Sequence, residues 1–267
     1  MSIHKNADVL IFNVRTGKSA RAGYEAEHLS GAVFVDLNSQ LAAINSDVSI
    51  GGRHPLPDQA VFAKTLTDLG ISKRTHVIVY DDANGSNAAA RFWWMLKWTG
   101  HDKVQVINGG LEQARKSNFP MRSGTETNSR ATEPYTIEQL TLPTVTMPEV
   151  KKAAQHPDYL VIDVRSKERF DGITEPIDLV AGHIPGAINI PFTENLDPNG
   201  LFLKPGELKS NYEKKFGDVK SERMIVHCGS GVTACHTLLA LSYAGMEIPG
   251  LYVGSWSEWS RGLGFQN

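Results

Sequence analysis

The chain has 267 residues, which is enough for two domains of ordinary size. A hydrophobic fraction of 41% and a charged fraction of 21% describe a globular protein, and the net charge of -2 gives no reason to expect nucleic acid as a partner. No stretch is apolar enough to cross a membrane, and the first residues lack the apolar core of a signal peptide. The two cysteines form neither a C-x-x-C pair nor a zinc set, so we expect no metal, no cofactor and a reducing, cytoplasmic location.

Four short motifs occur twice along the chain, in the same order and at offsets of 145 to 155 residues. A repeat of this kind indicates a tandem duplication. The pairs are residues 9–15 with 160–165, 28–32 with 183–187, 77–81 with 224–228, and 107–111 with 252–256.

Each copy alternates short β-rich runs with helical stretches, which predicts an α/β fold with a mainly parallel sheet flanked by helices. Helical spacing is clearest in residues 58–69, 87–98 and 234–244. A fourth helix should open near Pro148, because Thr146 and Glu149 have the spacing of a capping box.

The run between the copies, residues 122–134, is rich in Ser, Thr, Asn and Glu, as linkers are. We therefore predict a first domain over residues 1–120, a linker over 121–144 and a second domain over 145–267.

The most informative stretch is residues 224–234. An apolar run predicts a buried strand, two glycines turn the chain, and a helix follows, so Cys228 should lie where the strand ends and the helix begins. That edge is where open α/β sheets bind ligands. Inward-facing amides and the helix N-terminus favour a thiolate there.

The two cysteines and the matching position of the first copy have different expected roles. A cysteine is most often a small buried hydrophobe, and Cys235, inside the following helix, fits that role. The Gly229-Ser230-Gly231 turn favours a nucleophile at Cys228 instead. In the first copy the matching residue is Asp81, which is a poor substitute for a sulfur nucleophile. We expect the first domain to be non-catalytic.

Taken together, the duplicated domain, His-Ile-Pro-Gly-Ala at 183–187, Cys-Gly-Ser-Gly-Val-Thr at 228–233 and Gly-Ser-Trp-Ser-Glu-Trp at 254–259 resemble the two-domain rhodanese family. The Cys228 loop is similar to that of 3-mercaptopyruvate sulfurtransferases. Thiosulfate sulfurtransferases typically carry Arg-Lys in place of Gly229-Ser230.

The resemblance implies a sulfurtransferase. Cys228 would take a sulfane sulfur from 3-mercaptopyruvate or a related donor, hold it as a persulfide, and pass it to a thiophilic acceptor such as thioredoxin, another thiol or cyanide. Thiosulfate is the alternative donor.

The resemblance also implies roles for individual residues. Ser230 would relay a proton or bind substrate, and His54, in Arg-His-Pro-Leu-Pro at 53–57, would face the active site. Arg169 would bind the anionic group of the donor, with Asp163 orienting it. The remaining loop residues would hold the donor: Gly229, Gly231, Val232 and Thr233.

Two departures from the family pattern concern the donor. Asn38 stands where an acidic residue is usual, which leaves open whether His54 acts in catalysis. The segment 175–181 lacks the second substrate arginine, so we expect 3-mercaptopyruvate to be preferred but weakly bound.

Two other readings compete with a sulfurtransferase. A cysteine phosphatase would need an arginine six residues after the cysteine, where this chain has Ala234. A non-catalytic rhodanese-like module that regulates or binds would be natural if the cysteine were missing, but Cys228 is present. Turnover of a sulfur donor distinguishes an enzyme from such a module.

Overall fold

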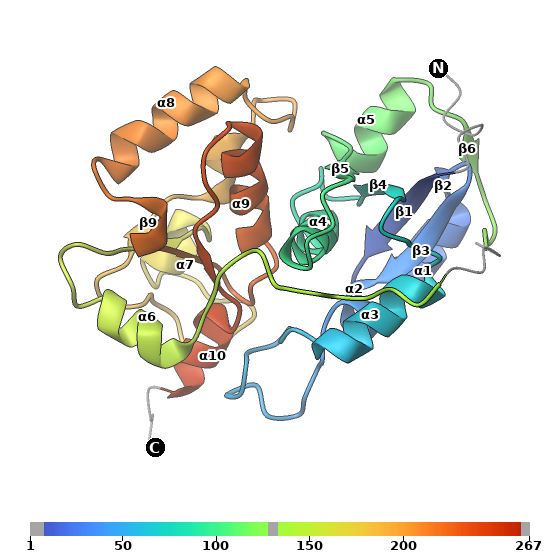
Figure 1. Cartoon of the computed structure of the whole chain (residues 1–267). Coiled ribbons are helices and arrows are strands. Elements are labelled where there is room, and N and C mark those ends of the chain that lie inside the picture. The colour runs from blue at the N-terminus through green and yellow to red at the C-terminus, as the bar shows by residue number, and fades with distance from the viewer. Residues whose placement is uncertain (1–7, 128–132, 263–267) are drawn as a thin grey trace. The chain divides into compact units, whose positions relative to one another are not determined.

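The computed structural model describes residues 8–127 and 133–262, and they form two compact units (Figure 1). The first unit takes the described residues up to Ala43 together with Pro57–Thr141. The second unit takes the described residues from Leu142 onward, and with them Ile44–Leu56. Nothing in the sequence predicted that this early segment belongs to the second unit.

The first unit is built on a four-stranded parallel sheet of order β3-β1-β4-β5. The central strand β1 is an apolar run buried along almost its whole length, as expected of a parallel strand covered on both faces. A short antiparallel pair, β2 and β6, lies outside this sheet. The strands are β1 (Val9–Arg15), β2 (His28–Leu29), β3 (Ala32–Asp36), β4 (His76–Tyr80), β5 (Val104–Val106) and β6 (Met121–Arg122).

Helices cover both faces of this sheet (Figure 1). The ring of Phe12 in β1 packs at 5.8 Å against Phe92 of α4, which packs at 6.4 Å against Phe62 of α3. On the other face, Leu111 of α5 packs with Ile11 of β1. The helices are α1 (Ala20–Ala26), α2 (Leu37–Gln40), α3 (Gln59–Asp68), α4 (Ala88–Trp98) and α5 (Gly110–Lys116), so the two predicted from helical spacing are confirmed.

The second unit has a five-stranded parallel sheet of order β7-β11-β10-β8-β9. Four of its strands, in the order β9-β8-β10-β11, repeat the arrangement β3-β1-β4-β5 of the first unit. The duplication seen in the sequence is therefore a duplication of topology, with β7 added at one edge. The strands are β7 (Thr144–Val145), β8 (Leu160–Asp163), β9 (Ile188–Asn189), β10 (Met224–His227) and β11 (Gly250–Tyr252).

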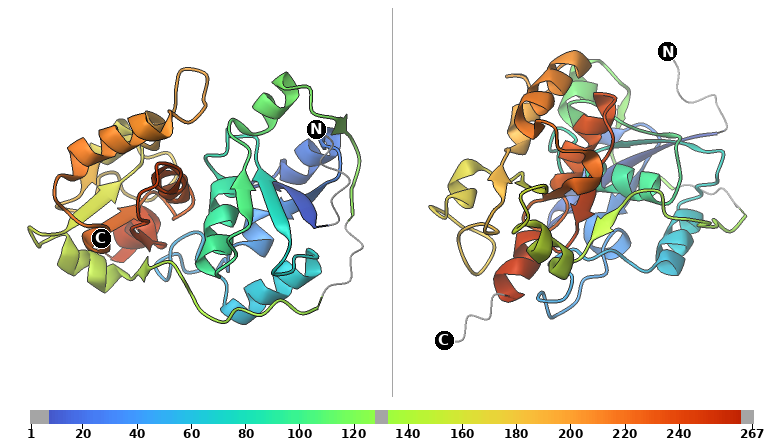
Figure 2. Two further views of the ribbon diagram at one scale, coloured as in Figure 1. Left: turned by 45° about the horizontal axis from the view of Figure 1, so that its top comes forward. Right: turned by 60° about the vertical axis from the view of Figure 1, so that its left-hand side comes forward.

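Two layers of helices enclose this sheet (Figures 1 and 2). Val150 of α6 and Trp256 and Trp259 of α10 share a core with Ile225 of β10, whereas α8 and α9 pack against each other on the other side. The elements are α6 (Met147–Ala153), α7 (Lys167–Phe170), α8 (Pro205–Phe216), α9 (Ala234–Tyr243), α10 (Ser255–Gly262) and the 3-10 helices η2 (Phe192–Asn195) and η3 (Ser221–Arg223).

Local signals account for the ends of the helices next to β10. The carboxylate of Glu149 accepts hydrogen bonds from the backbone N–H and the hydroxyl of Thr146, the predicted start of α6. The helix α9 begins at Ala234, as its sequence indicated. In the portion of the chain described, no helix has the length and apolar character needed to span a bilayer.

Candidate active site

Cys228 lies directly after β10, at the carboxyl end of the central strand of the second sheet. Its side chain is buried, and the loop 229–233 leads from it into α9. Gly231 has a φ of 70°, and a Cβ there would collide with the carbonyl oxygen of Val253, so only glycine fits. The sequence folds this way because a buried strand, a glycine turn and a ten-residue helix follow one another without a break.

The N-terminus of α10 clamps this loop through three hydrogen bonds. The Oγ of Ser255 accepts from the backbone N–H of Cys228 at 3.1 Å, and the carbonyl of Cys228 accepts from the N–H of Trp256 at 3.0 Å. The N–H of Ser257 donates to the carbonyl of Gly229 at 2.8 Å. The Gly-Ser-Trp-Ser-Glu-Trp motif therefore fixes the position of the cysteine.

Ser255 is held in an unusual backbone conformation. Its φ is 55°, in the left-handed region that costs a residue with a side chain about 1 kcal/mol or more. The same side chain donates to the carbonyl of Tyr252 at 2.9 Å while it accepts from Cys228. Two buried hydrogen bonds thus offset the strain.

Several backbone N–H groups of the Cys228 loop have no acceptor among the described residues, namely those of Ser230, Val232 and Thr233. Ser230 and Val232 are buried residues, and unpaired N–H groups at the start of a helix can bind an anion. In the first unit the corresponding loop supplies its own acceptor. The carboxylate of Asp81 accepts four hydrogen bonds there, from the N–H groups of residues 83, 85, 87 and 89.

Ser230 and His54 are hydrogen-bonded, with 2.8 Å between Oγ and Nδ1. His54 lies on the 44–56 segment, so this contact is within the second unit, whereas the predicted domain boundaries put His54 in the first domain. In the first unit, the amide oxygen of Asn38 accepts a hydrogen bond from the hydroxyl of Thr16 at 3.3 Å. A serine hydroxyl against an imidazole can move a proton to or from a group beside the thiol.

Two guanidinium groups flank Gly229. The Nη2 atoms of Arg53 and Arg169 lie 3.0 Å and 3.4 Å from the position that a Cβ on Gly229 would take. Arg169 was expected near this loop, whereas Arg53, which precedes His54 in the chain, was not. Arg53 brings a second cation to Gly229 from the 44–56 segment.

A buried carboxylate, Asp178, gathers these arginines. Its oxygens accept from Arg53 at 3.0 and 3.3 Å, from Arg169 at 3.5 Å and from Arg261 at 3.5 Å, and its side chain is fully buried. Glu175 holds Arg169 in addition, at 2.7 Å. Neither carboxylate was singled out from the sequence, where each is an isolated acidic residue in a loop.

The ionisation of Glu175 follows from its surroundings. Burial pushes the pKa of this carboxyl upward, but hydrogen bonds from Arg169 and from the backbone amides of Asp178 and Ile177 outweigh burial. The net pKa of Glu175 is lowered, so the carboxylate stays charged against the guanidinium groups.

The expected role of Asp163 needs correction. Asp163 does not orient Arg169; it holds Arg165, with 2.6 Å between Oδ2 and Nη2. The Nη2 of Arg165 also donates to the carbonyl of Gly182 at 2.7 Å. The contact is local because Arg165 lies two residues after Asp163 at the end of β8, whereas Arg169 points to the 175–178 carboxylates. Behind the pair, burial lowers the pKa of His227 and keeps its imidazole neutral.

The remaining predicted residues lie along the loop. Val232 is buried, Thr233 is half-buried at the start of α9, and Cys235 is buried inside the helix with its thiol 3.3 Å from the carbonyl oxygen of Gly231. Across residues 8–127 and 133–262, no three or more His, Cys, Asp and Glu side chains gather in a way that could hold a metal ion.

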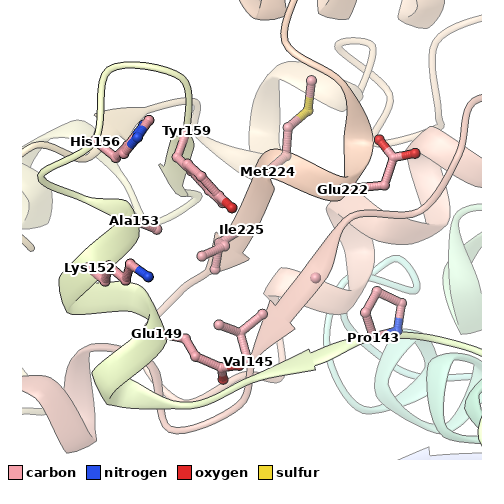
Figure 3. A pocket seen from close by; sticks show the side chains of 11 residues that line it. Pro143, Val145, Glu149, Lys152, Ala153, His156, Tyr159, Glu222, Met224 and Ile225 are labelled. Atoms are coloured by element: carbon pink, nitrogen blue, oxygen red, sulfur yellow. The ribbon is translucent and has the colours of Figure 1, made fainter.

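A cavity of about 460 Å³ lies at the opposite edge of the same sheet (Figure 3). Met224 and Gly250, at the amino ends of β10 and β11, line it together with Val145 and residues of α6. Cys228 follows the carboxyl end of β10, so this cavity is separate from the candidate active site.

Comparisons with known proteins agree with this geometry. The rhodanese-like domain model matches residues 2–117 and 146–261. A probable 3-mercaptopyruvate sulfurtransferase of Pseudomonas aeruginosa is 40% identical over 88% of this chain and 82% of its own length. A thiosulfate sulfurtransferase of Rattus norvegicus is 35% identical over 91% of this chain and 81% of its own. Among solved structures, the 3-mercaptopyruvate sulfurtransferase of Leishmania major superposes with a TM-score of 0.83 at 29% identity, covering 96% of this chain and 71% of its own.

The chain therefore belongs to the rhodanese-like family, with the domain present in two copies. Within that family it is a sulfurtransferase, as relatives that match most of its length are.

Proposed function

We propose that the protein moves a sulfane sulfur from 3-mercaptopyruvate, through a persulfide on Cys228, to a thiol acceptor or cyanide. The observation that carries the proposal is the placing of Cys228. Cys228 follows the end of β10 and opens the loop that leads into α9, and three N–H groups of that loop have no acceptor among the described residues. A persulfide anion supplies the acceptor that these groups need.

The first half of the reaction forms the persulfide. The Cys228 thiolate attacks the sulfur of 3-mercaptopyruvate, and a new sulfur–sulfur bond forms as the carbon–sulfur bond breaks. The electron pair of the broken bond goes to carbon as an enolate, which takes up a proton to give pyruvate. Ser230, hydrogen-bonded to His54, is placed to donate to the carbonyl oxygen or to deliver that proton.

Charge favours a singly charged donor. Four guanidinium groups, those of Arg53, Arg165, Arg169 and Arg261, contact three carboxylates, those of Asp163, Glu175 and Asp178. Four minus three leaves one positive charge, which offsets the Cys228 thiolate, so a singly charged donor adds one negative charge to the site. A doubly charged thiosulfate adds two negative charges to the same largely buried site, which is the less favourable case.

Thiosulfate remains the second candidate donor, because two guanidinium groups stand beside Gly229 where the sequence indicated one. The presence of Arg53 also removes the reason for expecting 3-mercaptopyruvate to bind weakly. A cytoplasmic location and thioredoxin as the natural acceptor are part of the same proposal. They are supported by the absence of a disulfide framework and by the chemistry of a persulfide.

Intact-mass spectrometry tests the proposal directly. After exposure to 3-mercaptopyruvate we expect one added sulfur atom on the parent protein and on Cys235→Ser, and none on Cys228→Ser. Steady-state kinetics with both donors then gives the preference. A Cys228→Ser protein that still gains sulfur would overturn the assignment, and a clearly higher kcat/KM for thiosulfate would overturn the donor.

A further inference from the structure

The loop 171–182 has two different faces. Glu175 and Asp178 point inward and are buried against the arginines. Ile177 and Leu179, the neighbours of Asp178, point outward and are 55% and 76% exposed. Ile173, at the start of the loop, is 70% exposed. One short segment thus anchors the charged cluster with one face and presents aliphatic side chains to solvent with the other.

The 44–56 segment, which Arg53 ties to Asp178, also carries an exposed aliphatic side chain. Ile50 is 62% exposed, and the N–H of the next residue, Gly51, donates to Glu258 of α10 at 2.8 Å. Among the described residues of the second unit, every exposed large aliphatic side chain lies on one of these two segments, including Ile44. We call Ile50, Ile173, Ile177 and Leu179 the aliphatic rim.

The aliphatic rim is tied to the Cys228 loop by direct contacts. Asp178, between two rim residues, bonds Arg53 and Arg169, whose guanidinium groups flank Gly229. On the other side, the indole N–H of Trp256 donates to the carbonyl of Val180 at 2.8 Å. The backbone N–H of the same residue donates to the carbonyl of Cys228. The residues that hold the nucleophile therefore also hold the rim.

We infer that the aliphatic rim is the docking surface for a protein acceptor, a small protein that presents a surface thiol. The inference rests on the proposed function. Cyanide or a free thiol needs only to reach the outer sulfur and gains nothing from large aliphatic side chains around the site. A protein that brings its thiol to a buried persulfide must cover this surface, and apolar contact then favours the complex.

The transfer itself is balanced. The acceptor thiolate attacks the outer sulfur of the Cys228 persulfide, and a new sulfur–sulfur bond forms on the acceptor. The bond between the outer sulfur and the Sγ of Cys228 breaks, with its electron pair left on Sγ. One anion is consumed and one is produced, and no oxidant or reductant takes part.

The test compares a protein acceptor with a small acceptor, using enzyme that carries the persulfide in both cases. The double variant Ile177→Ser/Leu179→Ser is loaded with 3-mercaptopyruvate, and discharge to reduced thioredoxin and to cyanide is followed. We expect kcat/KM for thioredoxin to fall about tenfold or more, from the loss of two apolar contacts, and turnover with cyanide to stay at the parent value. Val61→Ser, an exposed aliphatic residue of α3 in the first unit, is the matched control and should change neither.

Three results would count against the rim as a docking surface. Unchanged transfer to thioredoxin, equal loss with both acceptors, or a parent enzyme that serves cyanide but not thioredoxin would each overturn it. A parent dimer that becomes a monomer in the variant, with thioredoxin transfer intact, would assign the rim to a second copy of the chain. If no donor adds sulfur to Cys228 in the parent, it is the proposed function that fails.

Discussion

The Oγ of Ser230 lies 2.8 Å from the Nδ1 of His54, although 176 residues separate them in the chain. This contact joins the loop that carries the nucleophile to the 44–56 segment, and it gives the Ser230 hydroxyl an imidazole as hydrogen-bond partner.

Replacing the hydroxyl should affect the two donors differently. We expect Ser230→Ala to lower kcat with 3-mercaptopyruvate by about a hundredfold, because a carbonyl oxygen and a carbon must be polarised or protonated in that reaction. Thiosulfate has no carbonyl, so its turnover should change little. His54→Gln should follow the same pattern, and Ser242→Ala, in α9 away from the loop, should be silent. An equal loss with both donors would mean that Ser230 only supports the loop.

The two arginines beside Gly229 should act on donor binding. Arg53→Ala and Arg169→Ala should each raise the KM for 3-mercaptopyruvate by about one to two decades, as the loss of a charge-assisted hydrogen bond does. Arg53→Lys keeps the charge but not the bidentate geometry, so its KM should lie between that of the parent and that of Arg53→Ala. Arg223→Ala removes an exposed ion pair with Asp158 and serves as the control. An unchanged KM in Arg53→Ala would remove Arg53 from the donor site.

The hydrogen bond and the backbone conformation of Ser255 should have separate effects on the free energy of unfolding. Ser255→Ala leaves the buried N–H of Cys228 without an acceptor, at a cost of about 1–3 kcal/mol in the free energy of unfolding, and keeps the strained φ. Ser255→Gly loses the same bond but relieves the strain, so it should be less destabilising. Urea unfolding measures both. Ser260→Ala, a buried serine of α10 whose hydroxyl has no partner in the described structure, is the control. If Ser255→Ala is as stable as the parent, the hydrogen bond from Cys228 to Ser255 does not stabilise the loop.

His236 should make stability depend on pH. Burial lowers the pKa of this imidazole to about 3, and its ring stacks at 4.5 Å on Phe202. Since the folded pKa lies below the unfolded one, its contribution is complete above the unfolded pKa of about 6.5 and is lost as the pH falls toward 3.

The free energy of unfolding should therefore drop by about 2 kcal/mol between about pH 7 and pH 5 because of His236 alone. In His236→Gln that part of the drop should disappear, while the exposed His156→Gln should behave as the parent. If the free energy of unfolding changes with pH in the same way in the parent and in His236→Gln, the imidazole is charged in the folded state.

Local patterns made much of the fold and part of the site predictable. The repeated motifs, the helices α3, α4 and α9 and the turn after Cys228 depend on residues that are close in sequence, so spacing alone indicated them. The Asp81 substitution likewise marked the first copy as different.

What sequence reasoning missed depends on contacts between distant residues. Arg53 and Asp178 are 125 positions apart, and each looks like an ordinary surface charge in its own segment. The assignment of Asp163 to Arg169 was wrong because nothing in the spacing indicated that Glu175 and Asp178 fold back onto Arg169. One signal could have pointed to the loop: Glu175 and Asp178 stand among Ile173, Ile177 and Leu179, a mixture that is unusual for a polar surface loop.

The carboxylate of Asp81, held by four N–H groups of its own loop, has a consequence for how the two repeats are stabilised. The first repeat carries the acceptor for these N–H groups as part of the chain, so its loop is complete at any concentration of small molecules. The loop at Cys228 has no such built-in acceptor, and one must come from solution or from sulfur loading. Occupancy of that loop thus adds to the stability of the second repeat by mass action. The folding of one copy is independent of substrate, and that of the other is linked to it.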